Sequence, residues 1–182
     1  MKGRDSLELR TVRTSELDDE TRHEIVRLCI DAYQEEDFRN LFSYLPPEGI
    51  HVLAYLGERL VGHAVVTIRW LQAGHAPLMR TAYVDAVATS PPDQGTGIGS
   101  AVMRHLASVL DNCDIACLET TRTGFYERLG WEEWRGPLGG RTSEGVIATP
   151  DQRGVMILRL PSTPDLDLGQ LLTVEAHPAR IW

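Results

Sequence analysis

The sequence has 182 residues, of which 42% are hydrophobic and 24% charged, and its formal net charge is −8. This composition can form the core of one domain and excludes a largely disordered chain, and no apolar stretch approaches the ~20 residues that cross a bilayer. The acidic balance argues against binding to nucleic acid and favours a cationic partner.

The chain is expected to begin with a strand and a long helix. Apolar and polar residues alternate over Leu7–Arg13, as they do in a half-buried strand. Within Asp19–Tyr33 the apolar residues Leu28 and Cys29 lie three and four positions after Ile25, which places all three on one helical face. This segment is predicted to be a helix with one buried face.

Three apolar runs then follow a short helical piece. That piece, around Asp37–Tyr44, is expected to end before Pro46, because the residue ahead of a proline is biased away from helix. The runs His51–Leu56, Arg59–Trp70 and Leu78–Thr89 are separated by turn sequences that contain glycine. We expect them to form an antiparallel meander.

The second half is expected to alternate helices and strands. A helix is predicted over Ile98–Leu110 and a shorter one over Thr123–Arg128, with strands at Ile115–Thr120 and Val155–Leu160. The segment 136–154 is rich in glycine and polar residues and is expected to be mainly loop. The order of elements favours a single domain, residues 1–182, with a mixed sheet and helices on both of its faces.

The cysteines and histidines do not form a recognisable metal site. Cys29, Cys113 and Cys117 are an odd set without paired-ligand spacing, so they are expected to be buried, reduced thiols. The six histidines also lack close ligand spacing, so no metal is predicted. The N-terminal residues are charged where a secretory signal would be apolar, so the expected location is cytoplasmic.

A glycine-rich turn precedes the predicted helix at Ile98. In the stretch Gln94–Ser100, the residues Gly95, Gly97 and Gly99 permit positive φ and a close approach of the backbone to a ligand. Backbone N–H groups at a helix N-terminus favour an anionic phosphate. The alternatives are a plain tight turn and a dinucleotide fingerprint, but that fingerprint requires GxGxxG after the first strand of a parallel unit.

Three segments taken together resemble the GNAT acetyltransferase superfamily. They are Tyr83–Thr89, Gln94–Gly99 and Phe125–Trp131, in this order along the chain. The resemblance implies a GNAT fold of the α/β (α+β) class, with a mixed, mostly antiparallel sheet and a strand-loop-helix that binds pyrophosphate. It also implies acetyl-CoA as the acetyl donor and CoA as a product.

Shorter stretches are similar to the aminoglycoside 2′-N-acetyltransferases within that superfamily. They are Asp37-Phe38, Thr149-Pro-Asp and the final Ile181-Trp182. The chain departs from that subfamily at Phe42, where the subfamily carries a second acidic residue. The resemblance implies a cationic aminoglycoside as substrate, acetylation at its 2′-amine and hence antibiotic resistance, and it makes a homodimer the expected assembly.

The resemblance also implies two catalytic residues. Asp85 would receive the amine proton through a water molecule, and the phenol of Tyr126 would protonate the departing thiolate. The alternatives are that Asp85 is a solvent-facing strand residue and that Tyr126 is a helix tyrosine packed on Trp131. The backbone N–H of Val87 would polarise the thioester carbonyl.

Binding residues are assigned on the same basis. The acidic run Glu35, Glu36 and Asp37 would give an acceptor pocket negative potential, unless it is only a solvated helix end. The predicted cofactor-binding residues are Val87, Thr89, Gln94, Gly95, Thr96, Gly97, Ile98, Gly99 and Ser100. The predicted substrate-binding residues are Glu36, Asp37, Asp85, Glu119 and Trp182, whose indole would stack on a sugar unless the chain end is frayed.

Two further interpretations remain open at this point. One is a GNAT enzyme that acts on another small amine, a polyamine or a protein N-terminus. The other is a non-catalytic sensor that binds acyl-CoA, which the presence of both Asp85 and Tyr126 disfavours.

Overall fold

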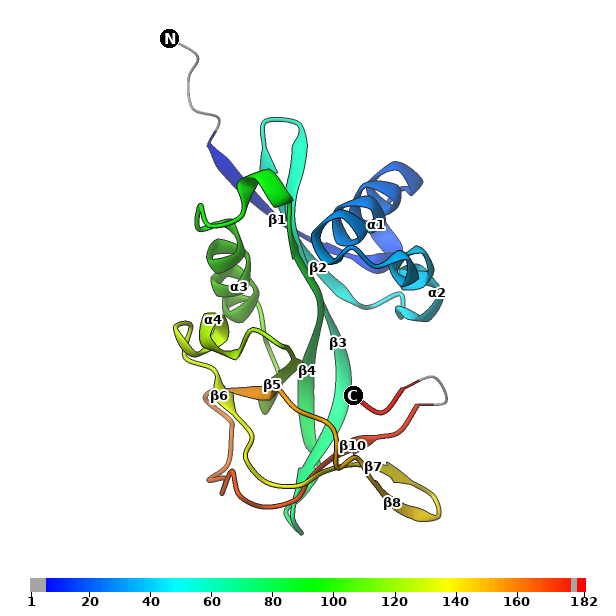
Figure 1. Ribbon diagram of the computed structural model, residues 1–182, viewed down its shortest axis with the longest axis vertical. Coiled ribbons are helices and arrows are strands. Elements are labelled where there is room, and N and C mark those ends of the chain that lie inside the picture. Colours follow the sequence, from blue (N-terminus) through cyan, green and yellow to red (C-terminus); the bar gives the residue numbers. More distant parts are fainter. Residues whose placement is uncertain (1–5, 178–179) are drawn as a thin grey trace. The chain divides into compact units, whose positions relative to one another are not determined.

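The computed structural model describes residues 6–177 and 180–182, and its contacts divide the chain into two compact units. The first unit is made from Met1–Thr67 and Asp85–Val109, and the second from Ile68–Val84 and Leu110–Trp182. Strands β3 (Arg59–Ala73) and β4 (Met79–Thr89) each contribute residues to both units (Figure 1).

The sheet of the first unit contains β1 (Leu7–Arg13), β2 (Ile50–Leu56) and the first part of β3, which are antiparallel, and the end of β4, which neighbours β3. Strand β1 pairs with β2 along its whole length, and β2 pairs with the first part of β3. The register between β2 and β3 shifts at Ala54 and Tyr55. The alternation in the sequence of β1 therefore predicted this strand correctly, and the antiparallel pairing of the first two meander runs is confirmed.

One face of this sheet is covered by the N-terminal helices. They are α1 (Asp19–Tyr33) and α2 (Leu41–Tyr44), with the 3-10 turns η1 (Thr14–Glu16) and η2 (Glu36–Asn40) beside them. Helix α1 begins where the Asp18 carboxylate accepts a hydrogen bond from the Thr21 N–H, and it ends at Gln34, which is left-handed. Its buried residues Ile25 and Cys29 pack in one apolar cluster with Leu53 of β2.

Helix α3 (Ile98–Ser108) covers the opposite face (Figure 1). Gly62 of β3 allows this close approach, because a Cβ placed there would lie 2.9 Å from the Ile98 side chain and 3.1 Å from that of Val102. Successive side chains of a strand point to opposite faces, so β2 and β3 serve both helix layers. Helices therefore lie on both faces of the sheet, as predicted.

The second unit is built around a mixed set of strands. Strand β5 (Ile115–Glu119) runs parallel to β4 at Thr81–Tyr83 and antiparallel to β9 (Val155–Arg159). Strand β10 (Leu172–Glu175) is antiparallel to the end of β3 and parallel to β7 (Leu138–Thr142). The remaining elements are β6 (Glu132–Glu133), β8 (Gly145–Ala148) and the short helix α4 (Thr123–Glu127).

The expectation that 136–154 is mainly loop is wrong for its central part. Strands β7 and β8 form an antiparallel hairpin there. The glycines that indicated a loop instead allow close packing, since a Cβ on Gly140 would lie 2.8 Å from Ile181 and one on Gly139 would lie 2.9 Å from the Ile147 carbonyl oxygen.

The three cysteines are free and buried, as expected. Burial raises the pKa of Cys29 to about 12, so this thiol stays protonated and unreactive at neutral pH. Within the described residues, no helix has both the length and the apolar character needed to span a membrane.

Candidate active site

The C-terminal half of β4 contains a local distortion of the strand at one residue. Ala86 has φ +50°, in the left-handed region that residues with a Cβ seldom occupy, and Asp85, Ala86 and Val87 are all half-buried. We call these three residues the β4 kink. The positive φ of Ala86 interrupts the alternation of an extended strand. The directions of the Asp85 side chain and the Val87 amide therefore depend on the conformation of Ala86.

Two side chains hold the carbonyl groups of the β4 kink. Nδ1 of His63 lies 2.8 Å from the Ala86 carbonyl oxygen, and the Tyr33 hydroxyl donates to the Val87 carbonyl oxygen at 2.8 Å. His63 comes from β3 and Tyr33 from the last turn of α1. Neither residue was singled out from the sequence, because their partners are backbone atoms 23 and 54 positions away.

The predicted acidic segment belongs to the same unit. Glu36 and Asp37 begin η2 and are exposed, and Glu36 pairs with Arg39. The ring of Phe38, the next residue, lies 4.7 Å from that of Tyr33, whose hydroxyl reaches the β4 kink. The fold thus links the acidic run to the strand that carries Asp85.

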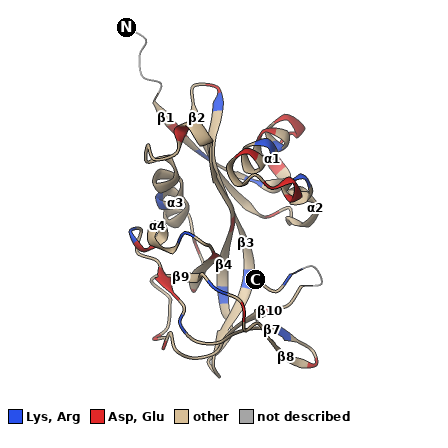
Figure 2. Ribbon diagram, in the orientation of Figure 1, with Lys and Arg blue, Asp and Glu red and all other residues tan. Residues whose placement is uncertain are grey.

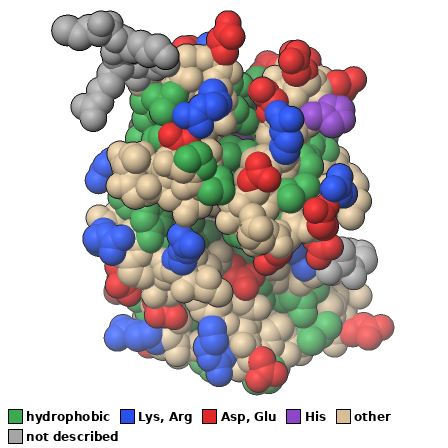
Figure 3. Space-filling view, turned by 45° about the horizontal axis from the view of Figure 1, so that its top comes forward, with side chains coloured by type: hydrophobic (Ala, Val, Ile, Leu, Met, Phe, Trp, Pro, Cys, Tyr) green, Lys and Arg blue, Asp and Glu red, His purple; other side chains and the backbone are tan. Residues whose placement is uncertain are grey.

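Acidic residues are frequent along α1 and the segment after it, as Figure 2 shows. The face in Figure 3 presents acidic and basic side chains interspersed with apolar ones. A groove of about 680 Å³ runs along α1, and it is lined by Glu20, His23, Glu24, Val26, Arg27, Ile30, Asp31 and Arg39. Because this lining mixes both charges and includes none of the predicted site residues, we do not assign the groove to the active site.

The glycine turn is open on the side of its missing side chains. Gly95 has φ +78° and Gly97 has φ +95°, and a Cβ added to either would meet no other atom within 4 Å. Gly97 is the N-cap of α3, and no side chain caps this helix. The first-turn N–H groups of α3 therefore have no side-chain cap, and the glycine side of the turn is open to an anionic group.

A set of polar contacts fixes the turn on the sheet. Arg59 forms two hydrogen bonds with the Asp93 carboxylate, at 2.6 and 3.2 Å, and the Thr96 hydroxyl donates to the Asp93 carbonyl oxygen at 2.6 Å. The side-chain amide of Gln94 donates to the Thr89 carbonyl oxygen at 3.1 Å. Hydrogen bonding from Arg59 lowers the pKa of Asp93, which keeps the carboxylate ionised.

The other predicted cofactor residues begin α3. The side chain of Ile98 is 6% exposed and packs against the sheet at Gly62, while Gly99 and Ser100 are half-buried in the first helical turn. The Ile98 side chain therefore anchors the helix to the sheet. A ligand at the turn would bind its backbone.

Tyr126 lies in the second unit and is 7% exposed. Its ring packs edge to face with Trp131, with 5.9 Å between ring centroids, and it also contacts Phe125. Burial raises the pKa of Tyr126 to about 12, so the phenol keeps its proton throughout the neutral range. Packing on Trp131 and a role as proton donor are compatible, since the first uses the ring and the second the hydroxyl.

Glu119 and Trp182 also belong to the second unit. Glu119 ends β5 opposite Val155 and is exposed. The Trp182 indole is 5% exposed, and its Nε1–H donates to the Thr149 hydroxyl at 3.1 Å. Two of the short stretches that resemble one subfamily are therefore in contact, but the indole packs within this unit, and sugar binding by Trp182 stays a prediction.

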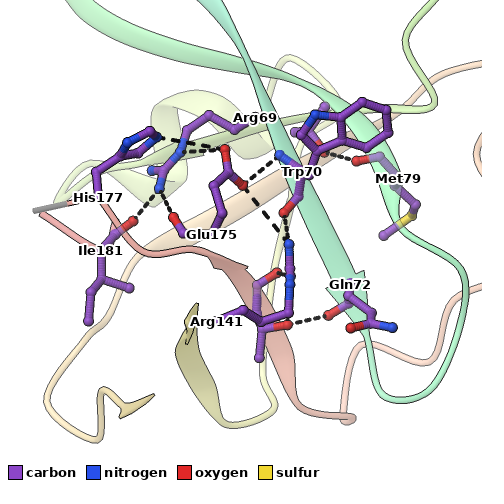
Figure 4. A network of polar contacts seen from close by, with 10 residues as sticks. Arg69, Trp70, Gln72, Met79, Arg141, Glu175, His177 and Ile181 are labelled. Atoms are coloured by element: carbon purple, nitrogen blue, oxygen red, sulfur yellow. Dashed lines mark hydrogen bonds and ion pairs between the residues drawn. The ribbon is translucent and has the colours of Figure 1, made fainter. Parts of the chain in front are cut away.

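An arginine-centred network anchors the segment before Trp182 (Figure 4). Nη2 of the buried Arg69 donates to the carbonyl oxygens of Glu175 and Ile181, both at 2.6 Å. The Glu175 carboxylate accepts from the Trp70 N–H at 2.7 Å. These contacts tie Glu175 of β10 and Ile181 to β3.

Comparison with known proteins identifies the family. Residues 12–134 match the family model described as an acetyltransferase (GNAT) domain. The chain belongs to the GNAT acetyltransferases. It is 33% identical over 179 residues to an aminoglycoside 2′-N-acetyltransferase of Mycolicibacterium fortuitum, a match that covers 95% of this chain and 91% of that protein.

Solved GNAT structures share the fold. A GNAT family acetyltransferase from Brucella melitensis, solved in complex with acetyl-CoA, has a TM-score of 0.66 at 17% identity, covering 96% of this chain and 98% of that one. A GCN5-related N-acetyltransferase from Kribbella flavida has a TM-score of 0.57 at 19% identity over 72% of this chain, which spans only 34% of that structure. The predicted family and GNAT fold are therefore confirmed.

Proposed function

We propose that this GNAT enzyme transfers the acetyl group of acetyl-CoA to the 2′-amine of aminoglycosides. The observation that carries the proposal is the 33% identity to an aminoglycoside 2′-N-acetyltransferase over 95% of the chain. A match of this extent includes the acceptor-binding parts of a GNAT enzyme as well as those that hold the cofactor. Such a reaction would confer resistance to these antibiotics.

The glycine turn fits the pyrophosphate of acetyl-CoA. Gly95 and Gly97 leave open space in front of the turn, and the uncapped N-terminus of α3 supplies N–H donors and partial positive charge. The backbone of Val87 and Thr89 would pair with the pantetheine amides. Bound in this way, acetyl-CoA supplies an activated thioester carbonyl.

Asp85 and Tyr126 account for the two proton movements. As the amine nitrogen bonds to the acetyl carbon, Asp85 accepts the amine proton through a water molecule, and the Val87 N–H stabilises the charge on the carbonyl oxygen. The carbon–sulfur bond then breaks, and Tyr126 gives its proton to the leaving thiolate. The products are the amide and CoA with a free thiol.

The acceptor is a cation, so acidic residues would bind it. Glu36 and Asp37 are exposed at the start of η2, and Asp85 follows on β4 in the same unit. Glu119 and Trp182 complete the proposed set. Several ammonium groups of one aminoglycoside would each meet a carboxylate, which favours their charged form. The amine that reacts must lose its proton, and this is the task proposed for Asp85.

One observation favours a different acceptor amine. At Phe42, where the subfamily carries an acidic residue, the ring instead packs on His51 with 5.8 Å between centroids and lies beneath the Arg22 guanidinium. A site that lacks this carboxylate has one contact fewer for a polycation. A smaller amine with fewer positive charges is therefore the second candidate.

The test is to mix the purified protein with acetyl-CoA and a panel of aminoglycosides, follow the released thiol, and locate the acetyl group by NMR. Acetylation at the 2′-amine supports the proposal. Acetylation at another amine would overturn the position but keep the substrate class. Turnover with a small monoamine but with no aminoglycoside would favour the second candidate.

A further inference from the structure

A buried chain of polar side chains ends at the β4 kink. Nδ1 of His63 lies 2.8 Å from the Ala86 carbonyl oxygen, and Nε2 of the same ring lies 2.9 Å from Nδ1 of His51. Nε2 of His51 in turn lies 2.9 Å from the Thr14 hydroxyl. Both imidazoles are fully buried, and Thr14 is 4% exposed. The three side chains come from β3, β2 and η1, all within the first unit.

The direction of this chain follows from the acceptor at its end. A carbonyl oxygen only accepts, so Nδ1 of His63 carries a proton. In a neutral ring, Nε2 of His63 is then an acceptor, and Nδ1 of His51 must donate to it. Nε2 of His51 is then the acceptor for the Thr14 hydroxyl at 2.9 Å. The other acceptor near this hydroxyl, the Gly49 carbonyl oxygen at 3.2 Å, already accepts from the Thr14 N–H at 2.8 Å. Every donor in the chain therefore points towards the Ala86 carbonyl.

Both rings are held in the neutral form that this direction requires. Burial lowers the pKa of His51 to about 3, with further lowering from His63 and Arg22. Burial also lowers the pKa of His63 to about 4. Both imidazoles are therefore uncharged at neutral pH. The row of hydrogen bonds is suited to holding the Ala86 carbonyl in place more than to carrying a proton.

The β4 kink needs such support because its backbone is strained. A left-handed conformation is unfavourable for a residue with a Cβ, and such residues persist only where the surrounding structure holds them in place. Ala86 has φ +50° without the freedom of glycine. Its carbonyl is held from the buried side of the kink by His63, while Tyr33 holds the carbonyl of Val87.

We propose that His63 is a positioning residue, which fixes the Ala86–Val87 peptide through the hydrogen-bond chain from Thr14 and His51. The Ala86 carbonyl and the Val87 N–H belong to the same planar peptide group, so fixing one fixes the other. This inference rests on the proposed function, in which that N–H contacts the acyl carbonyl and Asp85 precedes it. His63 itself touches neither substrate.

The first experiment needs no substrate. Proton–nitrogen NMR of the ligand-free protein reports the amide of Val87 and the tautomers of the two buried histidines. We expect both rings to be neutral with protonated Nδ1, and the Val87 amide to shift and exchange faster in His63→Phe. A protonated Nε2 on His63, or an unchanged Val87 amide in the variant, would overturn the proposal.

A conservative variant separates positioning from packing. In His63→Asn, the side-chain amide stands where Nδ1 stood and can still donate to Ala86, although the contact with His51 is lost. Val65→Ala, two positions along β3 and fully buried, is the control for simple loss of packing. All three variants should melt at a lower temperature than the wild type.

Only His63→Phe should lose catalysis, because a misplaced reacting group can cost about 100-fold in rate. We expect kcat to fall about 10-fold or more in His63→Phe, with the affinity for CoA unchanged, and to stay within about 3-fold of wild type in His63→Asn and Val65→Ala. Equal kcat losses in all three variants would reduce His63 to a packing residue.

These results also separate the inference from the proposed function. If the wild type acetylated no aminoglycoside but the Val87 amide moved only in His63→Phe, the substrate proposal would fail and the positioning role would stand. If His63→Phe acetylated aminoglycosides at the wild-type rate, the positioning role would fail and the proposed function would stand.

Discussion

The glycine turn and the β4 kink both hold positive φ angles, but the protein maintains them in different ways. Gly95 and Gly97 adopt these angles without a Cβ penalty and face open space. Ala86 carries a Cβ, and side chains from two other elements hold the kink by its carbonyl oxygens. The glycine turn adopts its conformation without strain and is open to a ligand, whereas the β4 kink is strained and is held by hydrogen bonds.

The difference corresponds to the two tasks of the proposed site. A turn that binds the pyrophosphate must leave its N–H groups unused until a ligand arrives, so side chains near it would compete with that ligand. A strand that aligns a carbonyl-binding amide and a base must stay in one conformation throughout the reaction. Changes at the turn should therefore affect cofactor affinity, and changes at the β4 kink should affect kcat.

The largest effect is expected from Gly97→Leu. A side chain at φ +95° strains the turn and enters the space proposed for the pyrophosphate. Losing two hydrogen bonds to a charged group, about 2 kcal/mol each, would weaken CoA binding about 1,000-fold, measurable by calorimetry. Gly145→Leu is the control, since Gly145 has φ +132° and open space but lies in the β7–β8 hairpin. Equal loss of affinity in both variants would contradict the assignment.

Asp85→Asn should give the next largest effect, and it tests the β4 kink. Removing a general base typically costs 10²–10⁴ in rate, so we expect kcat to fall about 300-fold. CoA affinity should not change, because the glycine turn is intact. A matched change at the exposed Asp37, Asp37→Asn, should instead raise the KM of the acceptor. An Asp85→Asn variant with normal kcat would remove this residue from the mechanism.

Tyr126→Phe leaves both positive-φ regions unchanged and should lower kcat about 100-fold, since water can partly replace a lost proton donor. Burial raises the pKa of Tyr126 to about 12, so the phenol that donates the proton is fully present at pH 7–9. The rate should therefore show no alkaline loss from this residue below about pH 11, as a pH–rate profile can verify. A variant with the wild-type rate would leave Tyr126 as a packing residue only.

The buried histidines should make stability sensitive to acid. Their pKa values are lowered in the folded state, to about 3 for His51 and about 4 for His63, so below pH 6.5 the unfolded chain binds more protons. Stability from these neutral rings is complete above pH 6.5 and is lost towards pH 4, by up to about 1.4 kcal/mol per pH unit for each ring. In urea unfolding from pH 8 to pH 5, stability should change less steeply with pH in His63→Phe than in the wild type. The dependence should be unchanged in the buried control Val65→Ala, which removes no titratable group.

Tyr33→Phe should have the smallest effect. It removes one hydrogen bond to the Val87 carbonyl, and a hydrogen bond of this kind contributes about 0.5–1.5 kcal/mol. Since His63 still holds the adjacent peptide, we expect kcat to fall about 3-fold, well below the loss in His63→Phe. A larger loss than in His63→Phe would mean that Tyr33 is the main support of the β4 kink.

Local patterns in the sequence predicted much of the first unit. The alternation of Leu7–Arg13 and the helical spacing of Asp19–Tyr33 correspond to β1 and α1 with identical bounds. The helix predicted from Ile98 ends two residues early, at Ser108. These elements are amphipathic or half-buried, so periodicity alone identifies them. The β7–β8 hairpin was missed because its glycines were read as loop residues. They are required instead by close neighbours, Ile147 across the hairpin for Gly139 and Ile181 for Gly140.

The sequence by itself determined the family, the glycine turn before α3 and the acidic balance, because each depends on residue types at short, fixed spacing. The tertiary structure alone decided how the β4 kink is held. Ala86 lies in an ordinary strand sequence, and its positive φ depends on partners from β3 and α1 that no local pattern connects to it. The burial that makes His51 and His63 neutral is likewise a property of the packed fold, since an imidazole in an unfolded chain keeps its ordinary pKa.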